Sequence, residues 1–311
     1  MPKGRMLAIL AITFTAVLWG ISFLSIKVTV AVIPPMTLAL ARFILASVVL
    51  YLILKWVEPK TKLARKDMPL MAVAGILGVT AYFYFENNGV KLTSASSASL
   101  IIATIPILTL LGDFIFCGNK LSPIKIVSVV LSTFGVYLVV TTGDGSGGSG
   151  SKIGDLLMVG AALSWVVYSL VTRPLGQRYS QLAVVTYQTL FGTLTLIPFS
   201  LLEFSAWQPV SLTVTLNVIF LGLFCSALGY YLYVYAMGSL GVAVVSMFIN
   251  LVPVVAVVCS FFILKETVTM GQILGGVIII GSVYLASWQP KAVLLAEDKS
   301  KGFEKPASKN I

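Results

Sequence analysis

Two charged side chains lie within apolar stretches of this sequence in which charged residues are otherwise rare. Arg42 lies in the second apolar stretch, and Glu86 closes the third. Exposing a charge to lipid costs about 3 kcal/mol or more, so both residues are candidate functional groups and candidates for coupling to an ion. Glu86 is the stronger candidate for a proton or cation site. The structural alternatives are an Arg42 that binds backbone carbonyls of neighbouring helices and a Glu86 that forms an interfacial ion pair with Lys27 or Lys91.

Aromatic residues accompany these charges. Tyr82 lies one helical turn before Glu86 and on the same helical face, and Tyr230 and Tyr233 occupy the corresponding face of a later stretch. Interfacial aromatic belts and ordinary packing are the alternatives to a binding role. The predicted lining of a substrate cavity includes Trp19, Tyr82, Glu86, Trp165, Tyr230 and Tyr233.

Two prolines interrupt apolar stretches at equivalent positions. Pro106 and Pro253 each remove a backbone hydrogen bond and release the carbonyl four residues earlier, which predicts a kink within the helix. A bilayer tolerates such a break where the freed group is buried or lines a cavity. We expect the two prolines to act as hinges beside the polar anchors Ser99, Ser246 and Asn250. The alternative is that the helices accommodate the prolines without any function.

Several kinds of chemistry are excluded by what the sequence lacks. It contains no histidine, which removes His-ligated metals, His proton relays and Ser-His-Asp catalysis. Cys117, Cys225 and Cys259 show no C-x-x-C spacing, so neither a metal site nor a disulfide framework is indicated. No phosphate-binding G-x-x-x-x-G-K-[ST] loop is present. We therefore expect no cofactor, no metal and no enzymatic activity.

The composition indicates an all-α integral membrane protein. Apolar residues make up 58% of the 311 positions and charged residues only 10%. A helix needs about 20 apolar residues to cross the roughly 30 Å hydrocarbon core of a bilayer. Ten such spans are predicted, at 6–32, 35–56, 68–87, 94–117, 122–141, 154–172, 181–202, 211–237, 242–264 and 269–288.

The sequence is internally duplicated. Gly75 matches Gly222 and Pro106 matches Pro253 at an offset of 147, and Arg42 matches Gln188 at an offset of 146. Five spans in each half would place the second half upside down relative to the first, and such an inverted repeat is typical of transporters. The predicted organisation is a first repeat at 1–140, a flexible Gly/Ser linker at 141–152, a second repeat at 153–288 and a disordered cytoplasmic tail at 289–311.

The positive charges predict the orientation. With both termini in the cytoplasm, sixteen Lys and Arg residues lie inside and four lie outside or at outer helix ends, as the positive-inside rule requires. The net charge of +10 is then explained by topology and by attraction to anionic lipids. No nucleic-acid surface is indicated. The sequence does not define an oligomeric state, and a monomer is compatible with it.

Five segments carry a resemblance to a known family. They are LWGISFLSIK at 18–27, ARF at 41–43, SASSASLIIATIP at 94–106, VAVVSMFINLVP at 242–253 and LKET at 264–267. Together they resemble the EamA family of the drug/metabolite transporter superfamily over residues 6–288. The resemblance implies a ten-helix bacterial exporter of amino acids and related metabolites, with a central cavity bordered by helices three, four, eight and nine. One departure is that Glu266 ends the fourth helix of the second repeat, whereas Asn119 stands in the first.

The expected function is secondary active export of small amphipathic metabolites across the bacterial inner membrane by alternating access of two inverted repeats. Amino acids are the first choice of substrate, and membrane lipids and protons are the other expected partners. A flippase, or an exporter of lipid-linked or drug-like amphiphiles, remains the alternative, and a long apolar groove between helices would favour it. A membrane enzyme is disfavoured because the chain lacks histidine and has few acids.

Overall fold

The computed structural model describes residues 3–117, 122–142, 148–240, 245 and 248–287. These residues form helices and connecting turns, without strands, which confirms the predicted all-α class. In the first half, the elements are α1 (Lys3–Val30), α2 (Pro35–Val57), η1 (Arg65–Asp67), α3 (Met68–Gly75), η2 (Ile76–Ala81), α4 (Tyr82–Leu92), α5 (Ala95–Ile102), α6 (Ile105–Cys117) and α7 (Pro123–Thr142). In the second half, they are α8 (Gly148–Gly176), α9 (Gln181–Leu202), η4 (Phe204–Ala206), α10 (Leu212–Ile219), η5 (Phe220–Leu228), α11 (Gly229–Leu240), α13 (Leu251–Cys259), η6 (Ser260–Leu264) and α14 (Met270–Ser287).

Within the described part of the chain, eight helical segments are long and apolar enough to cross a membrane. They correspond to the first eight predicted spans, and several are built from consecutive short elements, such as α3, η2 and α4. Two further apolar segments, Leu251–Leu264 and Met270–Leu285, are shorter. Large apolar side chains such as Leu52 and Leu212 point outward and are more than half exposed, as expected for helices that face lipid.

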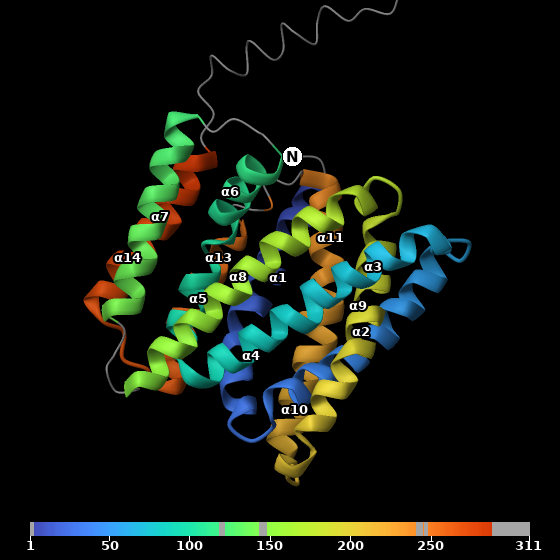
Figure 1. Cartoon of the computed structure of the whole chain (residues 1–311), viewed down its shortest axis with the longest axis horizontal. Helices are drawn as coiled ribbons and strands as arrows, with labels where there is room; N and C mark the ends of the chain where they lie inside the picture. Colours follow the sequence, from blue (N-terminus) through green and yellow to red (C-terminus); the bar gives the residue numbers. More distant parts are fainter. Residues whose placement is uncertain (1–2, 118–121, 143–147, 241–244, 246–247, 288–311) are drawn as a thin grey trace, which may run out of the picture.

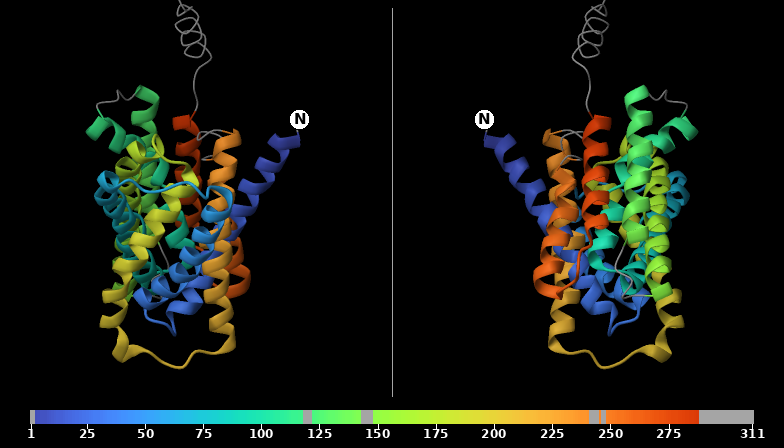
Figure 2. Two further views of the ribbon diagram at one scale, coloured as in Figure 1. Left: turned by 90° about the vertical axis from the view of Figure 1, so that its right-hand side faces the viewer. Right: turned by 90° about the vertical axis from the view of Figure 1, so that its left-hand side faces the viewer.

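The helices form one elongated bundle. In Figure 1, α7 and α14 lie side by side at one edge, and α2, α3 and α9 lie at the opposite edge. Helices α1, α4, α5, α8, α11 and α13 occupy the region between these edges. The side views in Figure 2 show most helices crossing the molecule in the same general direction. The middle of the bundle therefore receives residues from both halves of the chain.

Carboxylates of the second half bind helix N-termini of the first half. Glu203 accepts hydrogen bonds of 3.1 and 2.8 Å from the backbone N–H groups of Met36 and Thr37 in α2. Glu266 binds the first two N–H groups of α5 in the same way, at 2.9 and 3.1 Å. The left-handed backbone of Lys265, with φ of 56°, ends η6 immediately before Glu266. A carboxylate is favourable at a helix N-terminus because it pairs with unsatisfied N–H groups and the positive end of the helix dipole.

Two sequence-based expectations differ from the structure in detail. Both ends of the predicted linker 141–152 are helical, because α7 continues to Thr142 and α8 begins at Gly148, and residues 143–147 lie outside the described residues. A turn interrupts the helix just before each proline. Pro106 is the second residue of α6, after a turn that ends α5 at Ile102, and Pro253 lies in the first turn of α13 after a turn at Asn250. Proline is well tolerated in a first helical turn, where the N–H groups lack helical partners, so the helices restart at these positions.

Close backbone contact holds α7 against α14. A Cβ atom at Gly275 would lie 2.7 Å from the carbonyl oxygen of Gly135, and one at Gly135 would lie 2.8 Å from the carbonyl oxygen of Gly275. Small residues allow this approach, which is a common way for helices to associate where lipid offers no hydrophobic driving force.

We predict that Gly275→Ala destabilises the protein by about 1–3 kcal/mol, because the added methyl group must push rigid backbone apart. Gly281→Ala is the control on the same helix, since a Cβ there would meet nothing within 4 Å. Thermal unfolding in detergent should show a lower transition for Gly275→Ala and an unchanged or slightly higher one for Gly281→Ala. Equal transitions would contradict the close packing of α7 on α14.

Candidate functional site

Two irregular helical segments lie next to the candidate residues. Both η2 and η5 are π-helical, and they occupy equivalent positions in the two halves of the chain. Tyr82 directly follows η2, and Tyr230 follows η5 by one residue. A π-helical turn changes the direction of the side chains that follow it and is frequent at functional sites. The π-helical turns thus change the direction in which the side chains of α4 and α11 point.

Arg42 is buried in α2, with only 4% of its surface exposed. Its Nε donates a 3.1 Å hydrogen bond to the Ser226 hydroxyl in η5. Its guanidinium carbon lies 4.6 Å from the centre of the Phe83 ring, within the range of a cation–π contact. Its Nη1 has no hydrogen-bond partner among the described residues. Arg42 therefore does not bind neighbouring backbone carbonyls as the structural alternative required.

Glu86 is also buried, with 6% of its surface exposed. The Tyr82 hydroxyl donates a 2.9 Å hydrogen bond to Glu86 Oε1, as the one-turn spacing of these residues predicts. Within the described part of the chain, Glu86 Oε2 has no hydrogen-bond partner. The alternative ion pair with Lys27 is not formed, because the Lys27 ammonium donates to the backbone carbonyls at the end of α4. Lys91 is exposed, and no ion pair joins it to Glu86.

Arg42 and Glu86 are close enough to influence each other without forming an ion pair. A short chain of contacts joins them, because the Arg42 guanidinium packs on the Phe83 ring, the Phe83 ring centre lies 4.9 Å from that of Tyr82, and Tyr82 donates to Glu86. Nevertheless, no nitrogen of Arg42 lies within 4.0 Å of a Glu86 oxygen. The packing of α2 on α4 and η5 brings these groups into one neighbourhood. The site thus contains two buried groups of opposite sign, each with an atom available to another partner.

The predicted aromatic residues form two groups around these charges. The ring centre of Trp19 lies 5.5 Å from those of both Tyr230 and Tyr233. Trp19 also donates a 2.9 Å hydrogen bond from Nε1 to the Cys225 carbonyl, so its ring orientation is defined. The Trp165 ring centre lies 5.2 Å from that of Tyr82. Such aromatic contacts, with their defined geometry, make a rigid apolar wall.

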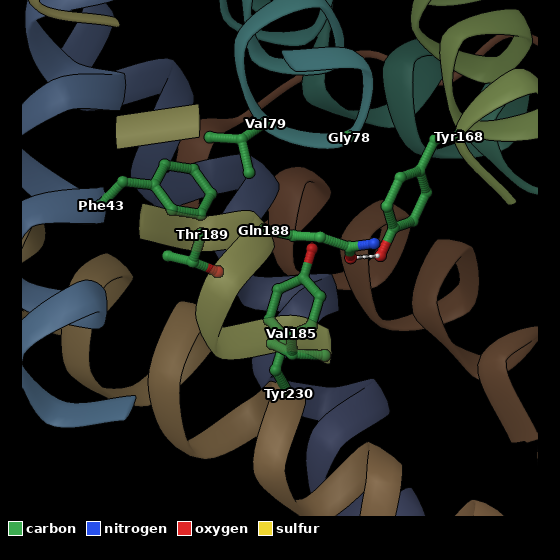
Figure 3. A pocket seen from close by; sticks show the side chains of 8 residues that line it. All are labelled: Phe43, Gly78, Val79, Tyr168, Val185, Gln188, Thr189 and Tyr230. Carbon is green, nitrogen blue, oxygen red and sulfur yellow. Dashed lines mark hydrogen bonds between the residues drawn. The ribbon is translucent and has the colours of Figure 1, made fainter. Parts of the chain in front are cut away.

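A cavity opens beside the aromatic groups, between α2, η2, α8, α9 and α11 (Figure 3). Its lining residues are Phe43, Gly78, Val79, Tyr168, Val185, Gln188, Thr189 and Tyr230. Tyr168 donates a 2.9 Å hydrogen bond to Gln188 Oε1, and Gln188 Nε2 donates to Thr172 at 3.0 Å. In Figure 3 the Tyr230 hydroxyl points toward Gln188. The cavity has a volume of about 10 Å³, which is room for about one water molecule.

The other predicted polar residues lie elsewhere or are otherwise engaged. Ser99 is buried in α5 and donates to the Ser96 carbonyl of its own helix, at 2.8 Å. Asn250 precedes α13, is 5% exposed, and its Nδ2 has no hydrogen-bond partner. Ser246 lies outside the described residues. Neither Ser99 nor Asn250 has a hydrogen bond to the Arg42 and Glu86 groups.

Sequence reasoning missed several residues of the site. Ser226, Phe83 and Tyr168 were not among the candidates, although they contact Arg42, Tyr82 and Gln188 respectively. The duplication contained one usable signal, because it aligned Gln188 with Arg42 and thereby marked an equivalent buried polar position. In the part of the chain that the structure describes, no group of three or more acidic, Cys or His side chains could hold a metal ion.

The sequence model of the EamA-like transporter family matches residues 6–141 and, a second time, residues 152–288. The chain belongs to the EamA-like transporter family. It is accordingly a multi-pass membrane transporter and not an enzyme, in agreement with the resemblance of its sequence segments.

Relatives from archaea and bacteria carry transporter names. The chain is 29% identical over 281 residues to an uncharacterized transporter of Archaeoglobus fulgidus, which covers 89% of this chain and 96% of that protein. It is 30% identical over 278 residues to a probable terminal-alkyne amino-acid exporter of Streptantibioticus cattleyicolor, covering 89% and 92% of the two chains. A protein of known crystal structure shares the fold with a TM-score of 0.62 at 20% identity, over 93% of this chain and 97% of that one.

We predict that Ser226→Ala destabilises the protein by about 1–3 kcal/mol, because it leaves a buried guanidinium N–H without its acceptor. The same change at Ser239, which is exposed and bonds only within its own helix, should stay within about 0.5 kcal/mol of the wild type. Thermal unfolding in detergent compares the two variants. Similar transitions for both would show that the Arg42–Ser226 bond contributes nothing to stability.

Proposed function

We propose that this transporter exports small amphipathic metabolites, amino acids first, across the bacterial inner membrane. The observation that carries the proposal is the buried site in the middle of the bundle, where Arg42 and Glu86 lie among the aromatic rings of Trp19, Tyr82 and Tyr230. Aromatic walls accommodate an apolar side chain, and buried charges recognise polar groups of a small solute. The naming of one 30% identical relative as an amino-acid exporter supports this choice of substrate.

The proposed architecture is ten transmembrane helices in two inverted five-helix repeats that alternate access to the site. The internal duplication supports it, as do the equivalent positions of η2 and η5 and of the helix restarts at Pro106 and Pro253. The short irregular turns before these prolines are the proposed hinges, because they interrupt helices beside the centre of the bundle. Both termini are proposed to lie in the cytoplasm, according to the distribution of Lys and Arg.

Tyr230→Ala should reduce counterflow of labelled amino acids in reconstituted liposomes by about tenfold without reducing the yield of folded protein. The variant removes a ring that lines the cavity and contacts Trp19, and an aromatic contact with its buried area contributes about 1–3 kcal/mol. Tyr284→Ala is the control, because Tyr284 is 51% exposed on α14.

The same liposomes distinguish the flippase alternative. If wild-type protein exchanges no amino acid but moves a lipid-linked substrate between leaflets, the exporter proposal is wrong. Equal loss of counterflow in both tyrosine variants would instead show that Tyr230 acts only through general packing.

Glu86 is proposed to couple transport to protons, since it is a buried acid with an available oxygen. Arg42 and Tyr82 are the ionisable groups that act on it. Glu86→Gln should remove the pH dependence of net transport while exchange of substrate for substrate remains measurable. Glu58→Gln, outside the site, should keep the wild-type pH profile. A pH profile unchanged by Glu86→Gln would exclude Glu86 as the coupling residue.

A further inference from the structure

We propose that Arg42 and Glu86 together form a binding site for a zwitterion, in which Arg42 binds the α-carboxylate and Glu86 binds the α-ammonium group of an amino acid. This inference rests on the proposed function and adds which atoms recognise the substrate. It makes both charges part of a single recognition site.

The two residues each hold one bonding atom in place and leave another without a partner. Ser226 orients the guanidinium through Nε, and Tyr82 orients the carboxylate through Oε1. The atoms left over are Arg42 Nη1 and Glu86 Oε2, both buried and without hydrogen bonds to any residue that the structure describes. A buried charged group with unsatisfied bonding capacity is costly, so each of these atoms has a strong preference for a partner of opposite charge.

The arrangement differs from a structural ion pair. Two opposite charges in a low-dielectric interior attract each other strongly, and a side chain as long as arginine usually closes the gap to a neighbouring carboxylate. Here each charge is held by a group from its own surroundings, Arg42 by Ser226 and the Phe83 ring, and Glu86 by Tyr82. The two charges interact but remain farther apart than 4.0 Å. Because each charged group has its own partners, both groups remain able to bind a ligand.

The signs of the two charges select among classes of solute. An anionic solute would neutralise Arg42 and leave Glu86 unpaired, and a cationic solute would do the reverse. A neutral amphiphile would pair with neither. Only a solute that carries both charges close together satisfies Nη1 and Oε2 at once, and the α-carboxylate and α-ammonium groups of an amino acid are such a pair. A site built around buried polar groups rejects analogues that lack one of the matching groups.

The aromatic residues complete the recognition by surrounding these charges. Tyr82 links Glu86 to Trp165. Trp19 packs on Tyr230, with their ring centres 5.5 Å apart. A substrate held by its zwitterionic end would therefore place its side chain against aromatic rings. This arrangement favours amino acids with apolar side chains.

The test uses counterflow in liposomes of the full-length protein, with labelled L-phenylalanine, L-leucine and L-threonine as probes. Counterflow needs no ion gradient, so it measures recognition separately from coupling. For the amino acid that is exchanged, the competitors are its N-acetyl derivative, which lacks the ammonium group, and its amide, which lacks the carboxylate. Each should compete about tenfold or more weakly than the parent, since each loses one charge-assisted bond.

The variants should change selectivity in opposite directions. Glu86→Gln should remove the discrimination against the N-acetyl derivative and keep that against the amide. Arg42→Gln should remove the discrimination against the amide and keep that against the N-acetyl derivative. Glu203→Gln is the matched control, because its carboxylate caps α2 away from the site, and both ratios should stay at the wild-type value.

The counterflow results test the proposed function and the zwitterion site separately. If wild-type protein exchanges none of the three amino acids, the proposed function fails and the zwitterion site fails with it. If an amino acid is exchanged but both derivatives compete as well as the parent, the proposed function stands and the zwitterion site is overturned. That second comparison needs only wild-type protein, so it holds even if the charge variants do not fold. Variants that reduce exchange without changing either ratio also overturn the site.

Discussion

Hydrocarbon offers no hydrogen-bond partners, so the polar groups of this membrane protein must find their partners within the chain. Many hydroxyl groups of the bundle bind carbonyls of their own helix, as Ser99, Thr15 and Thr186 do. Helix ends are bound by carboxylates and serines. The few buried side-chain atoms that remain without a partner therefore stand out. Arg42 Nη1 and Glu86 Oε2 are two of them, and they lie in the same part of the bundle.

The need of polar groups for partners within the chain also connects its two halves. Glu203 and Glu266 belong to the second half, and they bind the N-termini of α2 and α5 in the first. In the opposite direction, Glu58 of the first half accepts a 2.7 Å hydrogen bond from Ser180, the residue that caps α9. These contacts lie at helix ends, whereas the charged and aromatic site lies between them. Helix ends thus hold the halves together around a central site whose own polar groups are left incompletely bonded.

The sequence predicted which residues belong to the site better than it predicted which of them contact one another. Glu86 and Tyr82 are on one helix, so their spacing was enough to predict that they meet. Arg42 and Ser226 are far apart in sequence and come from different halves, so no local pattern indicated their bond. Trp19 and Trp165 were both expected to line the cavity, but the sequence could not show that Trp19 packs on Tyr230 and Tyr233 while Trp165 packs on Tyr82. The prolines were correctly read as interruptions, but not as residues within a first helical turn.

The sequence by itself determined the all-α class, the positions of the apolar helices and the internal duplication. These features depend on local composition, because a span must be apolar over its length whatever it packs against. The tertiary structure alone decided that Lys27 binds carbonyls and leaves Glu86 to Tyr82. It also decided that Arg42 and Glu86 are held apart by separate partners. These contacts depend on distances between helices. Helix packing determines those distances, and the sequence of a single span does not contain them.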